Sequence, residues 1–405
     1  MKNLLENIEG FKKPKSHGVH VLILGVSHYR HAEGGAEETD EGLDSGLGQL
    51  NGCAMSAAKF AEWILNDHHI PDLPLKSLRV LLSPAEGEEV SETIKNILPE
   101  DHAATLKNIK RTYKAFLKDS KKEKDGMLIV YMCGHGVQIK KDNAHLLLED
   151  FGHADHANVL EASTSIQGLR DGAKGKYHPQ KQFWFADCCQ LPPEEAATYE
   201  SLSGGYKPDV PAGVIESDHL FVATAPLSPA WLEQGKQTVF NNSLLCVLEQ
   251  YGGTSLEADQ YTIQAGGLTT ALQTMINKIL DRANEGVDED QKLEQLVQNI
   301  GVSSLTHFHV YQTPPDLPVI LSLSPDAALP TKATVKSGIG HDADIAFTGQ
   351  AEGDLNFSLN PGIYVIDCEP SGVFDSFQKL LSIELKNELL SEQGLLPKQL
   401  SFEIG

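Results

Sequence analysis

The sequence predicts an α/β sandwich built on a mostly parallel sheet, followed by a small all-β, sandwich-like domain. Several short apolar runs lack polar alternation, as expected for strands that are buried on both faces of a parallel sheet. Segments with helical apolar spacing separate these runs. From about residue 326 the chain changes to short alternating segments broken by turns. We therefore expect a lead-in over 1–17, an α/β domain over 18–323 and a β domain over 326–405.

The expected elements follow in chain order. The β-branched and leucine residues of Val21–Val26 favour a first buried strand, and a loop rich in Gly, Glu and Asp follows over 29–48. Further strands are expected at 78–82, 127–133, 144–148, 182–188 and 220–225, with 308–311 and 319–323 closing the sheet. Helices are expected at 54–66, in two pieces within 90–117, and at 240–247, 268–283 and 288–299. Loops are expected at 168–180 and 191–216, and β-domain strands at 334–336, 344–347, 355–359, 364–368 and 399–404.

Composition limits the class of protein. The chain carries 33 Lys and Arg against 56 Asp and Glu, a formal charge of −23, which argues against nucleic acid as the main partner and mildly favours basic ligands or substrates. No run approaches the roughly 20 apolar residues of a membrane span, and the N-terminus lacks the apolar core of a signal peptide, so we expect no membrane partner. Six cysteines, two of them adjacent, indicate reduced thiols and a cytoplasmic protein.

Two apolar runs end in groups that carry chemistry. One ends in a carboxylate and two adjacent thiols, Asp187, Cys188 and Cys189, and the run over 127–133 ends in a Gly-His-Gly triplet centred on His135. Parallel strands that finish side by side bring such groups together at one edge of a sheet. A thiol needs a base to become the nucleophilic thiolate, and the imidazole of His135 is the candidate base.

These residues resemble the caspase-like cysteine peptidases, and more closely the metacaspase and prokaryotic caspase-homologue branch. Tyr131–Gly136 is similar to that family's aromatic-x-Ser-Gly-His-Gly block, and Asp187–Cys189 to its Asp-x-Cys block. Further matching blocks are Val21–Val26, Leu50–Ala57, Ala223–Pro226, Val239–Leu245 and Gln312–Pro314. The resemblance covers about residues 18 to 323 and implies a caspase-like α/β/α sandwich. The spacing of His135 and Cys189 also agrees with a histidine about 50 residues upstream of the cysteine in caspases.

The resemblance implies a Cys-His dyad. Cys189 would attack the scissile carbonyl and His135 would transfer a proton to the leaving amine, help that is typically worth about 10² to 10⁴-fold. The backbone amides of Gly136 and Cys189 would hold the oxyanion. Alignment on the Asp-x-Cys block selects Cys189, and strand alternation then points Cys188 into the core. Cys188 stays open as the alternative nucleophile.

The resemblance also implies a pocket for a basic residue before the cut. Asp187 lies two positions before Cys189, hence on the same face of the strand, and would bind the substrate's cation. Cys53, Ser56 and Cys133 are the other residues expected in this pocket, with Ser56 where the family often has a second aspartate and Cys133 where it usually has serine. One carboxylate can still bind a guanidinium through both oxygens, so Arg is favoured over Lys.

The expected function is therefore a cysteine endopeptidase that cuts protein substrates after Arg or Lys, within a regulated bacterial defence or cell-death cascade. An activating protease or regulatory partner is expected. Within 191–216 the only basic residue is Lys207, which precedes Pro208 and makes a poor cleavage bond, so a better place for activating cleavage is the basic stretch formed by Arg170, Lys174, Lys176 and Lys181.

Two other classes of function stay open. The first is a catalytically silent caspase-like scaffold whose β domain recruits partners. The second is a metal-binding or redox protein that uses Cys188, Cys189, His153 and His156, although adjacent cysteines rarely ligate one ion. We expect no metal site and no cofactor, with calcium dependence left open because acidic pairs such as Asp342 and Asp344 occur in turns.

Overall fold

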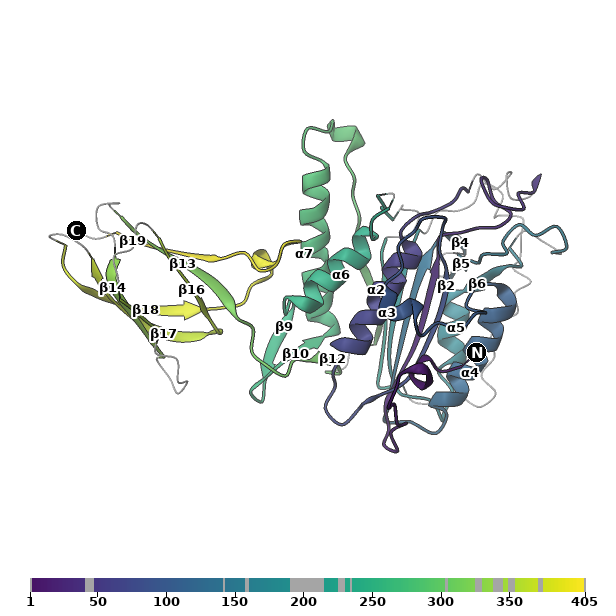
Figure 1. Cartoon of the computed structure of the whole chain (residues 1–405), viewed down its shortest axis with the longest axis horizontal. Coiled ribbons are helices and arrows are strands. Elements are labelled where there is room, and N and C mark those ends of the chain that lie inside the picture. Colours follow the sequence, from purple (N-terminus) through teal and green to yellow (C-terminus); the bar gives the residue numbers. More distant parts are fainter. Residues whose placement is uncertain are drawn as a thin grey trace.

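The computed structural model describes most of the chain. The described residues are 2–40, 47–140, 143–156, 160–189, 215–224, 230–233, 235–302, 305–324, 330–337, 345–348, 354–370 and 374–403. An α/β part and an all-β part lie end to end along the long axis of the molecule (Figure 1). Among the described residues, no helix is both long and apolar enough to cross a membrane.

The α/β part is built on a six-stranded sheet in the order β11-β8-β7-β3-β1-β2. Its strands are β1 (Val19–Val26), β2 (Leu75–Ser83), β3 (Met127–Gly134), β7 (Lys181–Cys188), β8 (Ser217–Val222) and β11 (Gln298–Val302). Five of them are parallel, and β11 runs antiparallel along β8 at one edge. Every residue of β1, β3 and β8 is buried, as the unbroken apolar runs predict.

Helices cover both faces of this sheet. Alternate residues such as Phe183 and Phe185 pack with one group of helices, whereas Trp184 packs with the other. The first group comprises α2 (Cys53–Asn66), α3 (Glu92–Lys95), α6 (Val239–Glu249) and α7 (Ala265–Ala283), and the second comprises α4 (Leu106–Ser120) and α5 (Ile166–Gly172). The predicted α/β sandwich with a mostly parallel sheet is confirmed.

Smaller elements surround the main sheet. A three-stranded sheet of β4 (Gly136–Lys140), β5 (Asn143–Leu147) and β6 (Ser163–Ser165) follows β3 directly. Helix α5 replaces the start of the loop predicted over 168–180. At the N-terminus the short helix η1 (Leu4–Asn7) buries Leu4 and Leu5 and is held to β2 by hydrogen bonds of the Asn3 side chain, so this lead-in is packed and not frayed.

The closing elements of the α/β part differ from the prediction. The predicted helix over 288–299 is a short turn, η2 (Glu289–Gln291), followed by β11, because pairing with the open edge of β8 overrides the apparent helical spacing. The segment 308–311 does not join the main sheet. It forms β12 (His307–Val310), which pairs with β10 (Gln260–Gln264) and through it with β9 (Thr254–Glu257).

The all-β part contains two packed sheets, which confirms the predicted sandwich-like domain. The predicted closing strand at 319–323 is β13 (Leu317–Ser324) of this part, and its alternating burial is that of a sandwich strand. The sheets are β16-β13-β19 and β15-β14-β17-β18, with β14 (Pro330–Ser337), β15 (Ile345–Thr348), β16 (Leu355–Leu359), β17 (Gly362–Pro370), β18 (Phe377–Ile383) and β19 (Lys398–Glu403). Strand β18 was not predicted.

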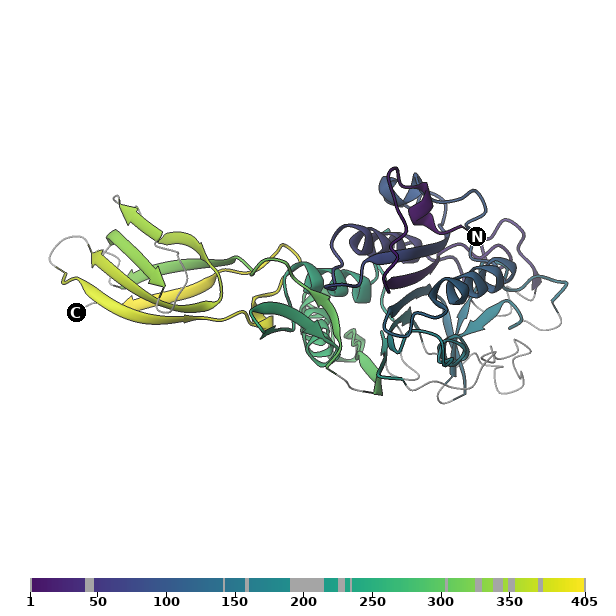
Figure 2. The same cartoon turned by 90° about the horizontal axis from the view of Figure 1, so that it is seen from below.

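The two parts are joined twice. Besides the connection that leads into β13, a segment over 385–396 with the short helix η3 (Asn387–Leu389) returns to the α/β part between β18 and β19 (Figure 2). It places Leu390, which is fully buried, in the core beneath α6 and α7. Gln250 and Ser391 exchange two hydrogen bonds across this contact, 2.6 and 3.1 Å long.

Candidate active site

Two neighbouring strand ends form the candidate site. Strands β3 and β7 pair in parallel, with Gly134 opposite Cys188, so the next residues, His135 and Cys189, leave the sheet at the same edge. The backbones that follow lie in direct contact, since a Cβ built on Gly136 would lie 2.3 Å from the carbonyl oxygen of Cys189. Only glycine fits at position 136 because any side chain would push these two backbones apart.

The imidazole of His135 is held in one tautomer. Its Nε2 lies 2.9 Å from the carbonyl oxygen of Gly48, which can only accept a hydrogen bond, so Nε2 carries the proton and Nδ1 is free to take one. The ring packs against Tyr29, with centroids 4.9 Å apart, and the Tyr29 hydroxyl accepts a 2.7 Å hydrogen bond from the backbone N–H of His135. Burial lowers the pKa of His135, and the Gly48 carbonyl opposes that shift.

The two adjacent thiols lie in different environments. Cys188 is 1% exposed and packs in the core on the α4 side, and burial raises its thiol pKa well above the ordinary value. Cys189 is partly exposed, and its Sγ accepts a 3.2 Å hydrogen bond from the backbone N–H of Ala230. Burial raises the pKa of Cys189 as well, and the Ala230 amide opposes that shift. Of the two adjacent thiols, Cys189 is thus the more exposed.

Asp187 is buried just below the two thiols. One oxygen, Oδ2, accepts hydrogen bonds from the hydroxyls of Tyr131, at 2.7 Å, and Thr238, and from the Cys133 thiol at 3.5 Å. The other oxygen, Oδ1, is buried and accepts no hydrogen bond from any residue that the structure describes. Burial raises the Asp187 pKa to about 6, and the three donors oppose that shift. This carboxylate therefore has one satisfied oxygen and one that lacks a donor.

The other predicted pocket residues surround Asp187 without bonding it directly, apart from Cys133. The Ser56 hydroxyl accepts a 3.0 Å hydrogen bond from the Thr238 backbone N–H and so holds the residue that donates to Asp187. Cys53 is the first residue of α2 and is 3% exposed. Both line the buried side of this cluster, and all six cysteines of the chain are free thiols.

The sequence analysis did not identify four of the groups that lie at this site. The Gly48 carbonyl and the Ala230 amide are backbone groups of loops, which no side-chain pattern reveals. Tyr29 lies far from His135 in the sequence and within a predicted loop. Thr238 does carry a signal, because it is the N-cap of α6 and accepts from the N–H of Asn241, a common role for Thr just before a helix.

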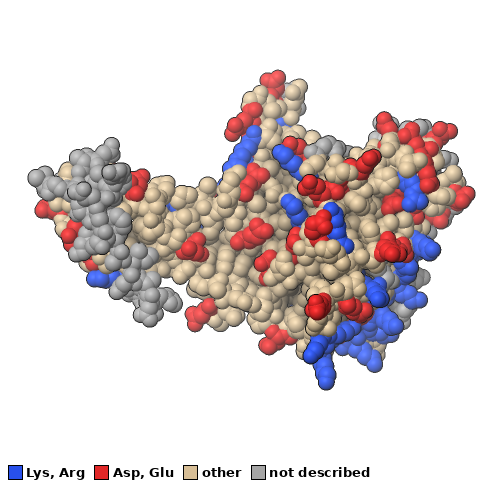
Figure 3. Space-filling view, in the orientation of Figure 1, with Lys and Arg blue, Asp and Glu red and all other residues tan. Residues whose placement is uncertain are grey.

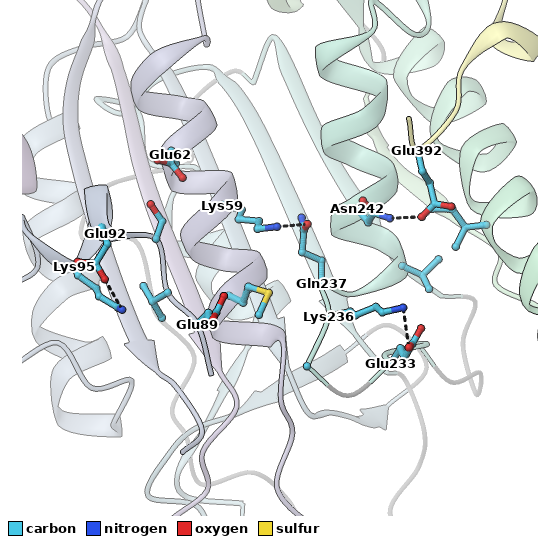
Figure 4. A pocket seen from close by; sticks show the side chains of 16 residues that line it. Lys59, Glu62, Glu89, Glu92, Lys95, Glu233, Lys236, Gln237, Asn242 and Glu392 are labelled. Atoms are coloured by element: carbon cyan, nitrogen blue, oxygen red, sulfur yellow. Dashed lines mark hydrogen bonds and ion pairs between the residues drawn. The ribbon is translucent and has the colours of Figure 1, made fainter. Parts of the chain in front are cut away.

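A separate cavity lies behind the loop that bears Thr238. It has a volume of about 800 Å³ and a lining of mixed charge between α2, α6 and the segment over 89–95 (Figure 4). Its lysines are paired inside it: Lys59 with Gln237, Lys95 with Glu92 and Lys236 with Glu233. None of the predicted site residues lines this cavity, so it is distinct from the thiol and imidazole.

The alternative metal site is not assembled from the predicted ligands. His153 and His156 pack against each other, with ring centroids 5.2 Å apart, and His153 packs against His31 at 4.8 Å. Over the described part of the chain, no three His, Cys, Asp or Glu side chains are arranged to hold a metal ion. The acidic pair at 342 and 344 lies outside the described residues, as does Lys207.

Comparisons with known proteins bear on this arrangement. The family model of the caspase domain (Peptidase C14) matches residues 19–303. The uncharacterised protein y4kE of Sinorhizobium fredii is 25% identical over 233 residues, which are 55% of this chain and 62% of that protein, so the chain spans a little under two thirds of this relative's length.

Two solved structures are similar at low identity. Caspase-1 from Spodoptera frugiperda has a TM-score of 0.40 at 12% identity, covering 71% of this chain and 88% of that one. A Geobacter sulfurreducens protein has a TM-score of 0.40 at 15% identity, covering 71% and 95%. The family match, which covers more than half of the chain and includes both strand ends, shows that the chain belongs to the caspase domain family of cysteine peptidases.

Proposed function

We propose that this protein is a cysteine endopeptidase that cuts protein substrates after Arg, and less readily after Lys, with Cys189 as the nucleophile and His135 as the acid and base. The observation that carries the proposal is the position of three groups at one edge of the sheet: a reachable thiol, an imidazole with a fixed tautomer, and a buried carboxylate with a free oxygen. Each group supplies a function that amide hydrolysis after a cation requires.

The reaction begins with proton transfer from the Cys189 thiol to Nδ1 of His135, the nitrogen left free by the bond to Gly48. The thiolate attacks the scissile carbonyl carbon, and the backbone amides of Gly136 and Cys189 are the proposed oxyanion donors. His135 then gives the proton to the leaving amine, which yields a thioester. Water, deprotonated by the same imidazole, hydrolyses that thioester and frees the thiol.

Burial disfavours the charged form of both reacting groups in the free protein. The pKa of Cys189 is raised and that of His135 is lowered, so the pair rests as a neutral thiol and a neutral imidazole. The Ala230 amide donates to the sulfur and therefore favours the thiolate when it forms.

The preference for a basic residue rests on Asp187. Within the described part of the chain its Oδ1 has no donor, and an unsatisfied buried oxygen costs about 1 to 3 kcal/mol, so a cation that reaches it gains affinity. The guanidinium of Arg can donate to Oδ1 and carries further N–H donors for neighbouring acceptors, whereas the ammonium of Lys is a single point charge. Arg is therefore favoured over Lys, and acidic residues are excluded.

The proposal extends to regulated proteolysis inside the cell, of the defence or cell-death kind. The free thiols support a reducing compartment, and the pathway rests on the resemblance to prokaryotic caspase homologues alone. Of the basic stretch considered for activating cleavage, Arg170 is buried in an ion pair with Asp218 at 2.7 Å, and Lys174 also bonds Asp218. Lys181 is the first residue of β7, which leaves Lys176 as the exposed candidate.

A panel of short fluorogenic peptides that differ only in the residue before the cut tests this function. Wild-type protein should cleave the Arg peptide fastest, the Lys peptide more slowly, and the Asp and Leu peptides least. Cys189→Ala should be inactive and Cys188→Ala active. A preference for Asp, or full activity of Cys189→Ala, would contradict the proposal, and parallel wells with calcium and with a chelator measure metal dependence.

A further inference from the structure

Lysines gather at the edge of the sheet opposite the candidate active site. Three segments enter β1, β3 and β7 there, and parallel topology places them side by side because these strands are neighbours. We call this surface the basic edge. It consists of the exposed lysines Lys12, Lys13, Lys15, Lys118, Lys121, Lys122, Lys124 and Lys176.

Hydrogen bonds between the three segments hold the basic edge together. The Lys122 N–H donates to the Tyr177 carbonyl at 2.7 Å, and the Gln180 N–H donates to the Lys124 carbonyl at 3.1 Å. The Gly18 N–H donates to the Glu123 carboxylate at 3.2 Å. These hydrogen bonds join the three segments into one continuous surface that carries the lysines.

The acidic residues of these segments do not neutralise the basic edge. Glu123 points inward and bonds Lys76 and His20, and Asp119 bonds Arg79. Within the three segments, 8–18, 118–126 and 176–180, the exposed carboxylates are Glu9 and Asp125, against the eight lysines. In a chain with 33 basic against 56 acidic residues, this is a strong local excess of positive charge. Figure 3 shows the Lys and Arg side chains gathered at the lower right of the α/β part.

Two exposed apolar side chains lie among the lysines. Ile8 is 38% exposed and Tyr177 is 45% exposed, and both belong to the segments that form the basic edge. Lysines that surround an aliphatic and an aromatic side chain are typical of surfaces that settle on lipid headgroups, where tyrosine occupies the interface. Sequence-specific nucleic-acid readout favours Arg in a groove, and single-strand binding favours several stacked aromatics, neither of which occurs here.

We propose that the basic edge docks the protein peripherally on an anionic lipid bilayer, a partner that the lack of an apolar span in the sequence did not lead us to expect. Each strand of eight residues spans about 26 Å at about 3.3 Å per residue, so docking leaves the dyad at the far edge, facing water. Attraction comes from lysines near anionic headgroups, and Ile8 and Tyr177 add contact with the interface. This surface is separate from the proposed peptidase site, and the inference holds whether or not the chain cuts peptides.

Vesicle co-sedimentation of the full chain tests the proposal. Wild-type protein should bind vesicles of phosphatidylcholine mixed with phosphatidylglycerol and not vesicles of phosphatidylcholine alone. The triple variant Lys118→Gln, Lys121→Gln and Lys124→Gln should lower the partition coefficient by about fivefold for each lysine, hence about 100-fold. High salt should release the wild type, because the Debye length shrinks to about 3 Å at 1 M.

The matched control removes the same charge elsewhere. Lys292→Gln, Lys379→Gln and Lys386→Gln replace three exposed lysines far along the chain and should leave binding unchanged. Tyr177→Ser should weaken binding by a few fold in a manner that salt does not alter. Equal unfolding temperatures establish that all variants are folded.

Several results would overturn the proposal. One is equal binding to neutral and anionic vesicles, and another is equal loss in the control variant. A third is duplex DNA or RNA that displaces the protein from vesicles at matched phosphate concentration, because the basic edge would then be a nucleic-acid surface.

Discussion

The two edges of the central sheet carry opposite kinds of chemistry. At the carboxyl edge lie a thiol, an imidazole and a carboxylate, each tied to a backbone group or hydroxyl, and the loop that follows β1 carries exposed acids such as Glu33, Glu37 and Glu38. At the amino edge lie exposed lysines with few partners of opposite charge. The same parallel topology builds both, because it gathers the ends of strands at one edge and their beginnings at the other.

This difference explains how a chain with a strongly negative net charge can still have one positively charged surface. At the carboxyl edge the functional groups are hydrogen-bonded and partly buried, so the loss of a single atom should change activity strongly. At the amino edge the functional groups are exposed charges, and their contributions to lipid binding should be smaller, additive and screened by salt. Substitutions at the carboxyl edge should therefore leave lipid binding unchanged, and substitutions at the amino edge should leave peptide cleavage unchanged.

The largest effect is expected at Cys189. Replacing it with Ala removes the nucleophile and should lower kcat by about 10⁴-fold or more. Replacing the buried Cys188 with Ala should retain activity and cost only core packing. Peptide cleavage measures the first property, and vesicle co-sedimentation, which should be unchanged in both variants, checks that the basic edge is independent.

The next effect is expected at Asp187. Asp187→Asn keeps the shape of the residue and removes its charge, so kcat/KM for an Arg substrate should fall by about 10²-fold or more, as expected for one lost member of a buried charge pair. The slower cleavage of a Leu substrate should change little. An equal loss for both substrates would assign Asp187 a purely structural role.

A smaller effect is expected at Tyr29. Tyr29→Phe keeps the ring that packs on His135 but removes the hydroxyl that accepts from its backbone N–H. An unsatisfied buried donor costs about 1 to 3 kcal/mol, so urea unfolding should show a loss in that range and kcat should fall about tenfold. Unchanged stability and rate would show that the hydroxyl does not hold the imidazole.

The smallest effect is a pH dependence of selectivity. The pKa of Asp187 is about 6 in the folded protein, against an ordinary value of 3.8. The preference for Arg over Leu requires the ionised carboxylate and should fade as pH falls through about 6. The folded state binds this proton more tightly than the unfolded state, so the stability from Asp187 is fully present below about pH 4 and is lost as pH rises through about 6. Asp187→Asn should flatten both profiles.

The side chains at the carboxyl edge could largely be predicted from the sequence because they follow unbroken apolar runs. Those runs predicted β3 and β7, and parallel pairing then required His135 and Cys189 to leave the sheet together. The roles of the Gly48 carbonyl and the Ala230 amide could not be predicted from the sequence, since backbone groups in loops leave no side-chain pattern. The basic edge could not be predicted from the sequence for another reason. Its lysines come from three segments that are distant in the sequence, and only the sheet topology brings them together.

The last elements of the α/β part were predicted wrongly because strand pairing depends on tertiary structure. The segment over 288–299 has helical spacing, yet its end is recruited as β11 by the open edge of β8. The strand β13 has an apolar run that resembles a sheet-closing strand, yet it pairs in the β part. Local pattern identified β13 as a strand but not its partner, and it did not reveal β11 at all, because strand pairing depends on which sheet edge is left open.

Labelling with an irreversible peptidyl inhibitor tests the central claim most directly. A peptide with Arg before a thiol-reactive ketone should modify the protein on Cys189, as located by mass spectrometry of the digest, and should react at least 100-fold faster than the matched Asp compound, the factor expected for loss of one buried charge pair. An adduct on Cys188, or faster labelling by the Asp compound, would contradict the account.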